Sequence, residues 1–208
     1  MLVGTGLDGS VPGLFPAAEV YVAGVFERIG GRAQSQFARV VKALNWLILE
    51  RLKVINMSLT GPFNLGMLFT LKIALRRGIT IVAAAGNAGP GSPPLHPAAM
   101  PGVIAVTAID AQRRPYVYNN QGSHIAFTAP GVNLPLPVPE QGGIRPQSGT
   151  SFAAPYVAGV AALWRQANPR AGPDMLLSDL ASRAISLGGR GRHPVFGFGL
   201  IQAPQACG

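Results

Sequence analysis

The sequence has very little cysteine and few charged side chains. Its 208 residues include one cysteine, Cys207, which excludes a disulfide within the chain and a cysteine metal cluster. Charged residues make up 12%, about half of the usual share, whereas hydrophobic residues make up 48%. A chain this apolar can bury a substantial core, so disorder, collagen and coiled coil are excluded.

Long apolar runs and a secretory leader are also lacking. The longest apolar stretch, residues 152–164, is interrupted by Gly159, and a membrane span needs about 20 apolar residues. The first ten residues, MLVGTGLDGS, have neither the basic start nor the apolar centre of a signal peptide. We predict no membrane association, and the sequence indicates no compartment.

Acidic residues are scarce beside basic ones, at 8 against 17, and the formal net charge is +9. A nucleic-acid-binding surface would predict a basic stripe interleaved with aromatic residues. The basic residues are instead scattered as singles and pairs such as Arg76-Arg77. We interpret them as a solvated surface and predict no nucleic-acid partner.

Short apolar segments alternate with helical periodicity along the chain. Strands are predicted over 19–26, 54–59, 79–84 and 103–109, with 124–129 as a candidate fifth strand. Helices are predicted over 35–50, 64–77, 152–167 and from 173 to about 184, with Gly78 at the C-cap position of the second. This alternation is typical of a parallel sheet covered on both faces. The sequence predicts one α/β domain over residues 1–208.

A glycine-rich segment near the start has the spacing of a dinucleotide-binding motif, at Gly4, Gly6 and Gly9. That motif needs a helix that opens at its last glycine. Pro12 and Pro16 stand where the helix would run, so a turn-rich loop is the better interpretation.

Ser151 lies in the sequence GTSFAAP, where a glycine-containing loop meets the start of a predicted buried helix. The N-terminus of a helix offers free N–H groups and a positive dipole end, which suit a developing oxyanion. Asn87 follows the predicted strand 79–84 at the sheet edge where ligands of α/β folds bind. Taken singly, each residue has a simpler interpretation, Ser151 as a helix cap and Asn87 as a loop residue.

Taken together, the segments resemble the subtilisin-like serine proteases, the subtilases. The similar segments are VINMSLTGP at 54–62, GITIVAAAGNAGP at 78–90, PAAMPGVIAVTAID at 97–110, GSHIAFTAPG at 122–131, GTSFAAP at 149–155 and FGFGLIQA at 196–203. The resemblance covers essentially the whole chain. It implies a serine endopeptidase with a parallel sheet, helices on both faces and a peptide or protein substrate.

The resemblance also implies roles for individual residues. Ser151 is the implied nucleophile, with Asn87 and the Ser151 N–H as oxyanion donors. The residues implied to form the two walls of a substrate pocket are Ser58, Leu59, Thr60 and Gly61 on one side and Ala84, Ala85 and Gly86 on the other. Thr60 stands where many relatives carry glycine, so we expect a different pocket shape. No cofactor is predicted; the resemblance allows calcium, but the few acids identify no site.

The Asp and His motifs of the family's catalytic triad are absent from this sequence. A serine hydroxyl needs an adjacent base that a third group orients. None of the eight acids, and none of His96, His124 and His193, lies in a matching Asp-x-Gly or His-Gly-Thr context. The first 26 residues resemble the stretch that follows the catalytic His. We therefore expect an N-terminal truncation, with a missing segment as partner. Because a lost strand leaves unpaired edges, we expect the chain to be aggregation-prone or only partly ordered.

These residues are compatible with three hypotheses. The chain is the C-terminal part of a subtilisin-like endopeptidase and inactive alone, a non-catalytic peptide-binding pseudoprotease, or a non-functional gene fragment. We favour the first because Ser151, Asn87 and both pocket segments are intact. Relatives are commonly exported, but this does not fix a compartment for the chain.

Overall fold

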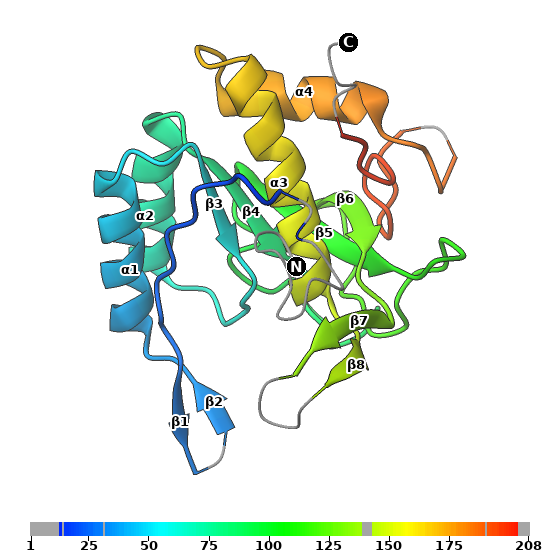
Figure 1. Cartoon of the computed structure of the whole chain (residues 1–208), viewed down its shortest axis with the longest axis horizontal. Helices are drawn as coiled ribbons and strands as arrows, with labels where there is room; N and C mark the ends of the chain where they lie inside the picture. The colour runs from blue at the N-terminus through cyan, green and yellow to red at the C-terminus, as the bar shows by residue number, and fades with distance from the viewer. Residues whose placement is uncertain (1–12, 14, 31, 139–142, 190, 204–208) are drawn as a thin grey trace.

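A parallel sheet forms the centre of the protein, shown in Figure 1 as a computed structural model that describes residues 13, 15–30, 32–138, 143–189 and 191–203. Its strand order is β3-β4-β5-β6. These strands are β3 (Val54–Met57), β4 (Thr80–Ala84), β5 (Val103–Ile109) and β6 (Ile125–Pro130). All three neighbouring pairs are parallel, so the carboxyl ends of the strands meet at one edge of the sheet.

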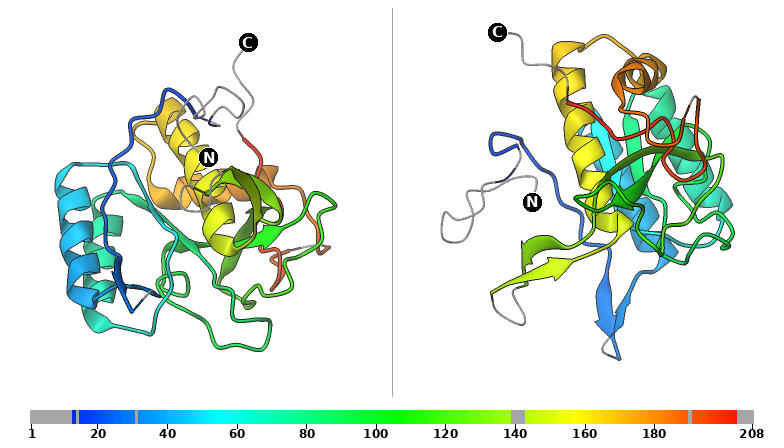
Figure 2. Two further views of the ribbon diagram at one scale, coloured as in Figure 1. Left: turned by 60° about the horizontal axis from the view of Figure 1, so that its bottom comes forward. Right: turned by 90° about the vertical axis from the view of Figure 1, so that its right-hand side faces the viewer.

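Helices cover both faces of the sheet. The elements α1 (Phe37–Leu49) and α2 (Leu65–Arg76) lie on one face, and α3 (Thr150–Ala167) and α4 (Pro173–Arg183) on the other. Figure 2 shows α3 across the sheet from α1 and α2. Successive side chains of β4 point to opposite faces: Ile81 packs under α1 and α2, and Val82 packs under α3. The predicted α/β fold with helices on both faces is confirmed.

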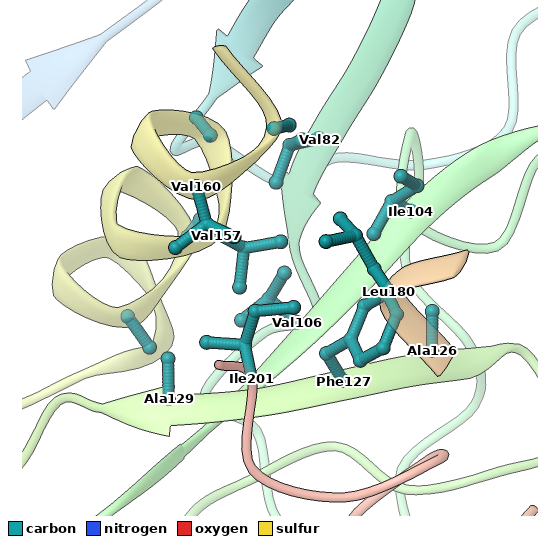
Figure 3. Close-up of a cluster of buried hydrophobic side chains, with 14 of the residues drawn as sticks. Val82, Ile104, Val106, Ala126, Phe127, Ala129, Val157, Val160, Leu180 and Ile201 are labelled. Atoms are coloured by element: carbon teal, nitrogen blue, oxygen red, sulfur yellow. The ribbon is translucent and has the colours of Figure 1, made fainter. Parts of the chain in front are cut away.

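The core beneath α3 fixes where this helix begins (Figure 3). Val157 of α3, Val82 of β4 and Phe127 of β6 belong to one buried cluster, and all three side chains are fully buried. Ile201 of the C-terminal segment closes the same core. Burial of one such side chain contributes about 1.5–3 kcal/mol, so sliding α3 along the sheet would cost several of these contacts.

The helix boundaries follow local signals. The Asn64 side chain accepts the N–H groups of Gly66 and Met67 at 2.8 and 3.3 Å and so caps α2 at its start. Gly78 follows the end of α2 with a φ of 76°, a conformation that suits glycine. In the part of the chain that the structure describes, no helix has the length and apolarity needed to cross a membrane.

The predicted strand over 19–26 is wrong. This segment is extended but pairs with no other described strand, and Val20, Val22 and Phe26 are 50%, 79% and 53% exposed. A strand needs a neighbouring backbone for its hydrogen bonds, and composition alone cannot supply one. The outer side of β3, at the sheet edge, is likewise unpaired by any described strand.

The sequence pattern does not predict two antiparallel hairpins. One joins β1 (Glu27–Ile29) to β2 (Arg32–Gln34), and the other joins β7 (Leu134–Pro137) to β8 (Ile144–Gln147). These strands are three or four residues long and include charged residues and prolines, so they lack the apolar runs that mark the central sheet. The glycine-rich segment Gly4–Gly9 lies outside the described residues.

Candidate active site

The start of α3 lies beside the carboxyl end of β4. Ser151 is the second residue of α3, and Asn87 lies three residues after the last residue of β4. Thr150 joins the two segments, because its N–H and its hydroxyl both donate to Oδ1 of Asn87, at 2.9 and 3.0 Å. The structure thus brings two predicted site residues together from segments 63 positions apart.

The two hydrogen bonds from Thr150 fix the orientation of the exposed Asn87 amide. With Oδ1 occupied, Nδ2 is a donor without an acceptor among the described residues. A Cβ at Gly149 would lie only 3.1 Å from this nitrogen, and the Gly149 φ of 151° also disfavours any side chain. The amide nitrogen therefore lies next to the first turn of α3, where the Ser151 N–H has no acceptor within the helix. Two adjacent donors can receive an oxyanion.

Thr150 also holds the predicted wall at Ala84–Gly86. The Gly86 N–H donates to the Thr150 hydroxyl at 3.2 Å, and the Ala85 N–H donates to the Val106 carbonyl at 2.9 Å. Thr150 is fully buried, and its hydroxyl both donates and accepts. Sequence reasoning gave Thr150 no role; its place directly before Ser151 is the signal that could have indicated one.

The other predicted wall, Ser58–Gly61, is joined to the same turn of α3. The Ser58 hydroxyl donates to the Ser151 carbonyl at 2.9 Å and accepts from Asn56 Nδ2 at 3.0 Å. Leu59 packs against the core under α1 and α2, and Thr60 is exposed. Because β3 and β4 are neighbours, the walls that follow them lie side by side at one edge of the sheet.

Asn120 supports the site and was missed by sequence reasoning. It is fully buried, and its backbone N–H donates to the Gly86 carbonyl at 3.0 Å. Its Oδ1 accepts the Ala88 N–H at 2.9 Å, and its Nδ2 donates to the Pro93 carbonyl at 3.1 Å. Asn120 therefore anchors the loop that carries Asn87. An asparagine in an irregular segment has no periodic signal, and the Asn119-Asn120 pair is the only hint in the sequence.

Comparison with known proteins agrees with this architecture. A model of the Subtilase family matches residues 1–199. The chain belongs to the subtilase family. This subtilase is 32% identical over 201 residues to the minor extracellular protease Epr of Bacillus subtilis (strain 168). The matched residues make up 96% of the chain and 30% of Epr. It is 34% identical over 201 residues to subtilisin amylosacchariticus of Bacillus subtilis subsp. amylosacchariticus. The matched residues make up 95% of the chain and 51% of that protein.

A solved structure shows the same fold. Fervidolysin from Fervidobacterium pennivorans, described as a keratinolytic enzyme related to subtilisin, matches with a TM-score of 0.71 and 28% identity. The match covers 79% of this subtilase and 28% of fervidolysin. The chain therefore spans about half or less of the length of these relatives. The predicted family is confirmed.

No described histidine or carboxylate of this subtilase hydrogen-bonds to the Ser151 hydroxyl. His96 pairs through its backbone with Gly61, and His193 pairs with Gly197. His124 precedes β6, and burial lowers the pKa of its imidazole below 6.5, with Arg192 and His96 adding to the effect. Among the described residues, no group of three or more His, Cys, Asp and Glu side chains could hold a metal ion.

Proposed function

We propose that this subtilase is a serine endopeptidase that forms an acyl-enzyme on Ser151. The observation that supports the proposal is the pairing of Asn87 with the first turn of α3 through Thr150. Attack by the Ser151 oxygen on a peptide carbonyl creates an oxyanion, which Asn87 Nδ2 and the Ser151 N–H would receive at the positive end of the helix dipole. The C–N bond then breaks, the amine leaves with a proton, and water hydrolyses the ester.

The proposed substrate is an extended peptide or protein chain. The walls Ser58–Gly61 and Ala84–Gly86 follow the adjacent strands β3 and β4. Ser58 and Gly86 both hydrogen-bond to the first turn of α3, which carries Ser151. The Ser58 hydrogen bond to the Ser151 carbonyl keeps the first wall and the nucleophile in register. The names of the relatives, which are proteases, support the same substrate class.

The proton of Ser151 needs a base, and the described residues supply none within hydrogen-bond reach of its hydroxyl. In a subtilisin, loss of the catalytic histidine alone lowers turnover by about 10⁶. We therefore propose that the base and its orienting carboxylate lie outside the described residues, and that the 208-residue chain alone is inactive. The relatives are at least about twice as long as the segment they share with this chain, which leaves room for such residues.

The test begins with the transcript. Its 5′ end and the reading frame upstream of Met1 show whether a longer chain with Asp-x-Gly and His-Gly segments is made. Peptide hydrolysis is then measured for the longer and the 208-residue chains, each beside its Ser151→Ala variant. We expect Ser151-dependent turnover from the longer chain only.

Three outcomes would contradict parts of this proposal. Turnover by the 208-residue chain at enzyme-like rates would show that no outside base is needed. A longer chain with both motifs that binds peptides without turnover would instead be a pseudoprotease. A frame that is closed just upstream of Met1 would remove the catalytic assignment of Ser151.

A further inference from the structure

The residues on either side of Asn87 are both hydrogen-bonded to Asn120. The Asn120 N–H donates to the Gly86 carbonyl at 3.0 Å, and Oδ1 of Asn120 accepts the Ala88 N–H at 2.9 Å. Asn120 is fully buried and belongs to the segment between β5 and β6, whereas Asn87 follows β4. The backbone before and after Asn87 is therefore tied to a single residue from a distant part of the chain.

The contact between Asn120 and this loop is close. Nδ2 of Asn120 also donates to the Pro93 carbonyl at 3.1 Å, so Asn120 binds the segment 86–93 at three points. Gly86 has a φ of 115°, and a Cβ there would lie only 2.8 Å from Oδ1 of Asn120. The loop and the Asn120 amide thus pack directly against each other, with no space for a side chain at Gly86.

Asn87 is held from two directions. Thr150 binds Oδ1 of its side chain, as described above, and Asn120 holds the backbone on both sides of its Cα atom. The position of Nδ2 depends on both anchors, because a side chain fixed only at Oδ1 can still move with its backbone. A catalytic donor must be held to within about 0.5 Å of its working position.

We propose that Asn120 is a positioning residue for the oxyanion and acts through Asn87. The inference rests on the proposed function. A misplacement of about 1 Å at a catalytic group can lower the rate by about 10²-fold. Without the Asn120 side chain, the loop loses its bonds at Ala88 and Pro93 and keeps the backbone bond at Gly86. Asn87 Nδ2 then no longer has one fixed place beside the first turn of α3.

The neighbouring residue Asn119 offers a matched control. It is fully buried as well, and its amide also makes one accepted and one donated bond to backbone, with the N–H and the carbonyl of Ala108 at 3.0 and 2.8 Å. Ala108 lies in β5 and not in the Asn87 loop. Asn119→Ala and Asn120→Ala should therefore lower the free energy of unfolding by similar amounts, and only the second should disturb Asn87.

Steady-state kinetics of the longer chain that contains the base test the proposal. Asn120→Ala should lower kcat by about 10- to 10²-fold and change KM by less than about twofold, because the oxyanion exists only in the transition state and the intermediate. Asn119→Ala should keep kcat within about twofold of wild type. Beside Asn87→Ala, the added Asn120→Ala should lower kcat by less than about twofold, because the donor that Asn120 positions is already gone.

The outcomes separate this inference from the proposed function. An equal loss of kcat in Asn119→Ala and Asn120→Ala, or an undiminished effect of Asn120→Ala beside Asn87→Ala, overturns the positioning role and leaves the proposed function in place. Absence of Ser151-dependent turnover in the wild-type longer chain overturns the proposed function and this inference with it. Circular dichroism checks that the variants are folded; if Asn120→Ala is not, Asn120→Ser, which keeps a hydrogen-bonding hydroxyl, decides the test beside Asn119→Ser.

Discussion

Thr150 donates both its backbone N–H and its hydroxyl to the Oδ1 atom of Asn87, at 2.9 and 3.0 Å. The same hydroxyl accepts the Gly86 N–H at 3.2 Å. One buried side chain therefore joins the carboxyl end of β4, the Asn87 loop and the first turn of α3. The orientation of the free Asn87 Nδ2 donor depends on this hydroxyl.

Replacing Thr150 by Val should lower the free energy of unfolding by about 1–3 kcal/mol, because the buried Gly86 N–H loses its acceptor. Thr150→Ser keeps the hydroxyl and is the matched control, with a smaller expected loss. Urea denaturation followed by circular dichroism measures both. An equal loss in the two variants would assign the effect to the missing methyl group instead of the hydrogen bond.

Replacing Asn87 by Ala should lower turnover by about 10²–10³ in a form of the enzyme that contains the base, a magnitude already known from a subtilisin. KM should change little, because the oxyanion exists only in the transition state and the intermediate. Steady-state kinetics on one peptide substrate, with Ser92→Ala as a control elsewhere in the same loop, measure the effect. An unchanged turnover number would remove Asn87 from the oxyanion role.

Arg165 is expected to destabilise the protein. It lies in the last turn of α3 and is 6% exposed; its Nη2 donates to the Gly78 carbonyl at 3.1 Å, but Nε and Nη1 have no acceptor among the described residues. Because unpaired buried charge is costly, Arg165→Leu should raise the free energy of unfolding by about 1–4 kcal/mol. The exposed control Arg76→Leu should change it by about 0.5 kcal/mol or less. A loss of stability in Arg165→Leu would show that the guanidinium has an acceptor outside the described residues.

The central sheet could be predicted because its signal is local. Each residue of β4 and β5 is buried, and a short run of apolar residues is enough to indicate such strands. Residues 19–26 are also mostly apolar, but strand formation depends on a partner that the segment itself does not encode. This is why the prediction was right for β4 and wrong for 19–26.

In the candidate site too, residues with a local sequence signal could be predicted, whereas contacts between distant segments could not. Ser151 and Asn87 follow recognisable segments, so their positions could be predicted from the sequence. The supporting contacts of Thr150 and Asn120 could not, because each joins segments that meet only after folding. Spacing along the chain carries no information on which carbonyl or amide a buried side chain will meet.

Acidification should destabilise the fold through His124. Burial, then Arg192 and His96, lower the pKa of His124 below 6.5, so the unfolded chain takes up this proton at a higher pH than the folded protein. The stability that the neutral His124 contributes to the folded protein is fully present above about pH 6.5, the pKa of histidine in the unfolded chain. It is lost as the pH falls through the lower pKa of His124 in the folded protein. Urea denaturation between about pH 5 and 7 measures the free energy of unfolding, and this free energy should fall less on acidification in His124→Gln than in wild type. Asp179 titrates lower, because N–H donors of Arg183 and Trp164 hold its pKa below 3.8. Parallel curves of unfolding free energy against pH for wild type and His124→Gln would contradict the assignment of the pH dependence to His124.

The edge of the sheet at β3 should cause self-association of the 208-residue chain. No described strand pairs with the outer side of β3. In the extended segment 19–26, the residues Val20 and Val22 are 50% and 79% exposed to solvent. Unpaired backbone beside exposed apolar side chains is a template for strand addition by another copy. Sedimentation velocity should therefore show a sedimentation coefficient that rises with protein concentration. Val22→Lys places a charge on the exposed segment and should weaken the association. If the wild-type chain is instead a monomer at all concentrations and unfolds cooperatively and reversibly on heating, this edge is protected.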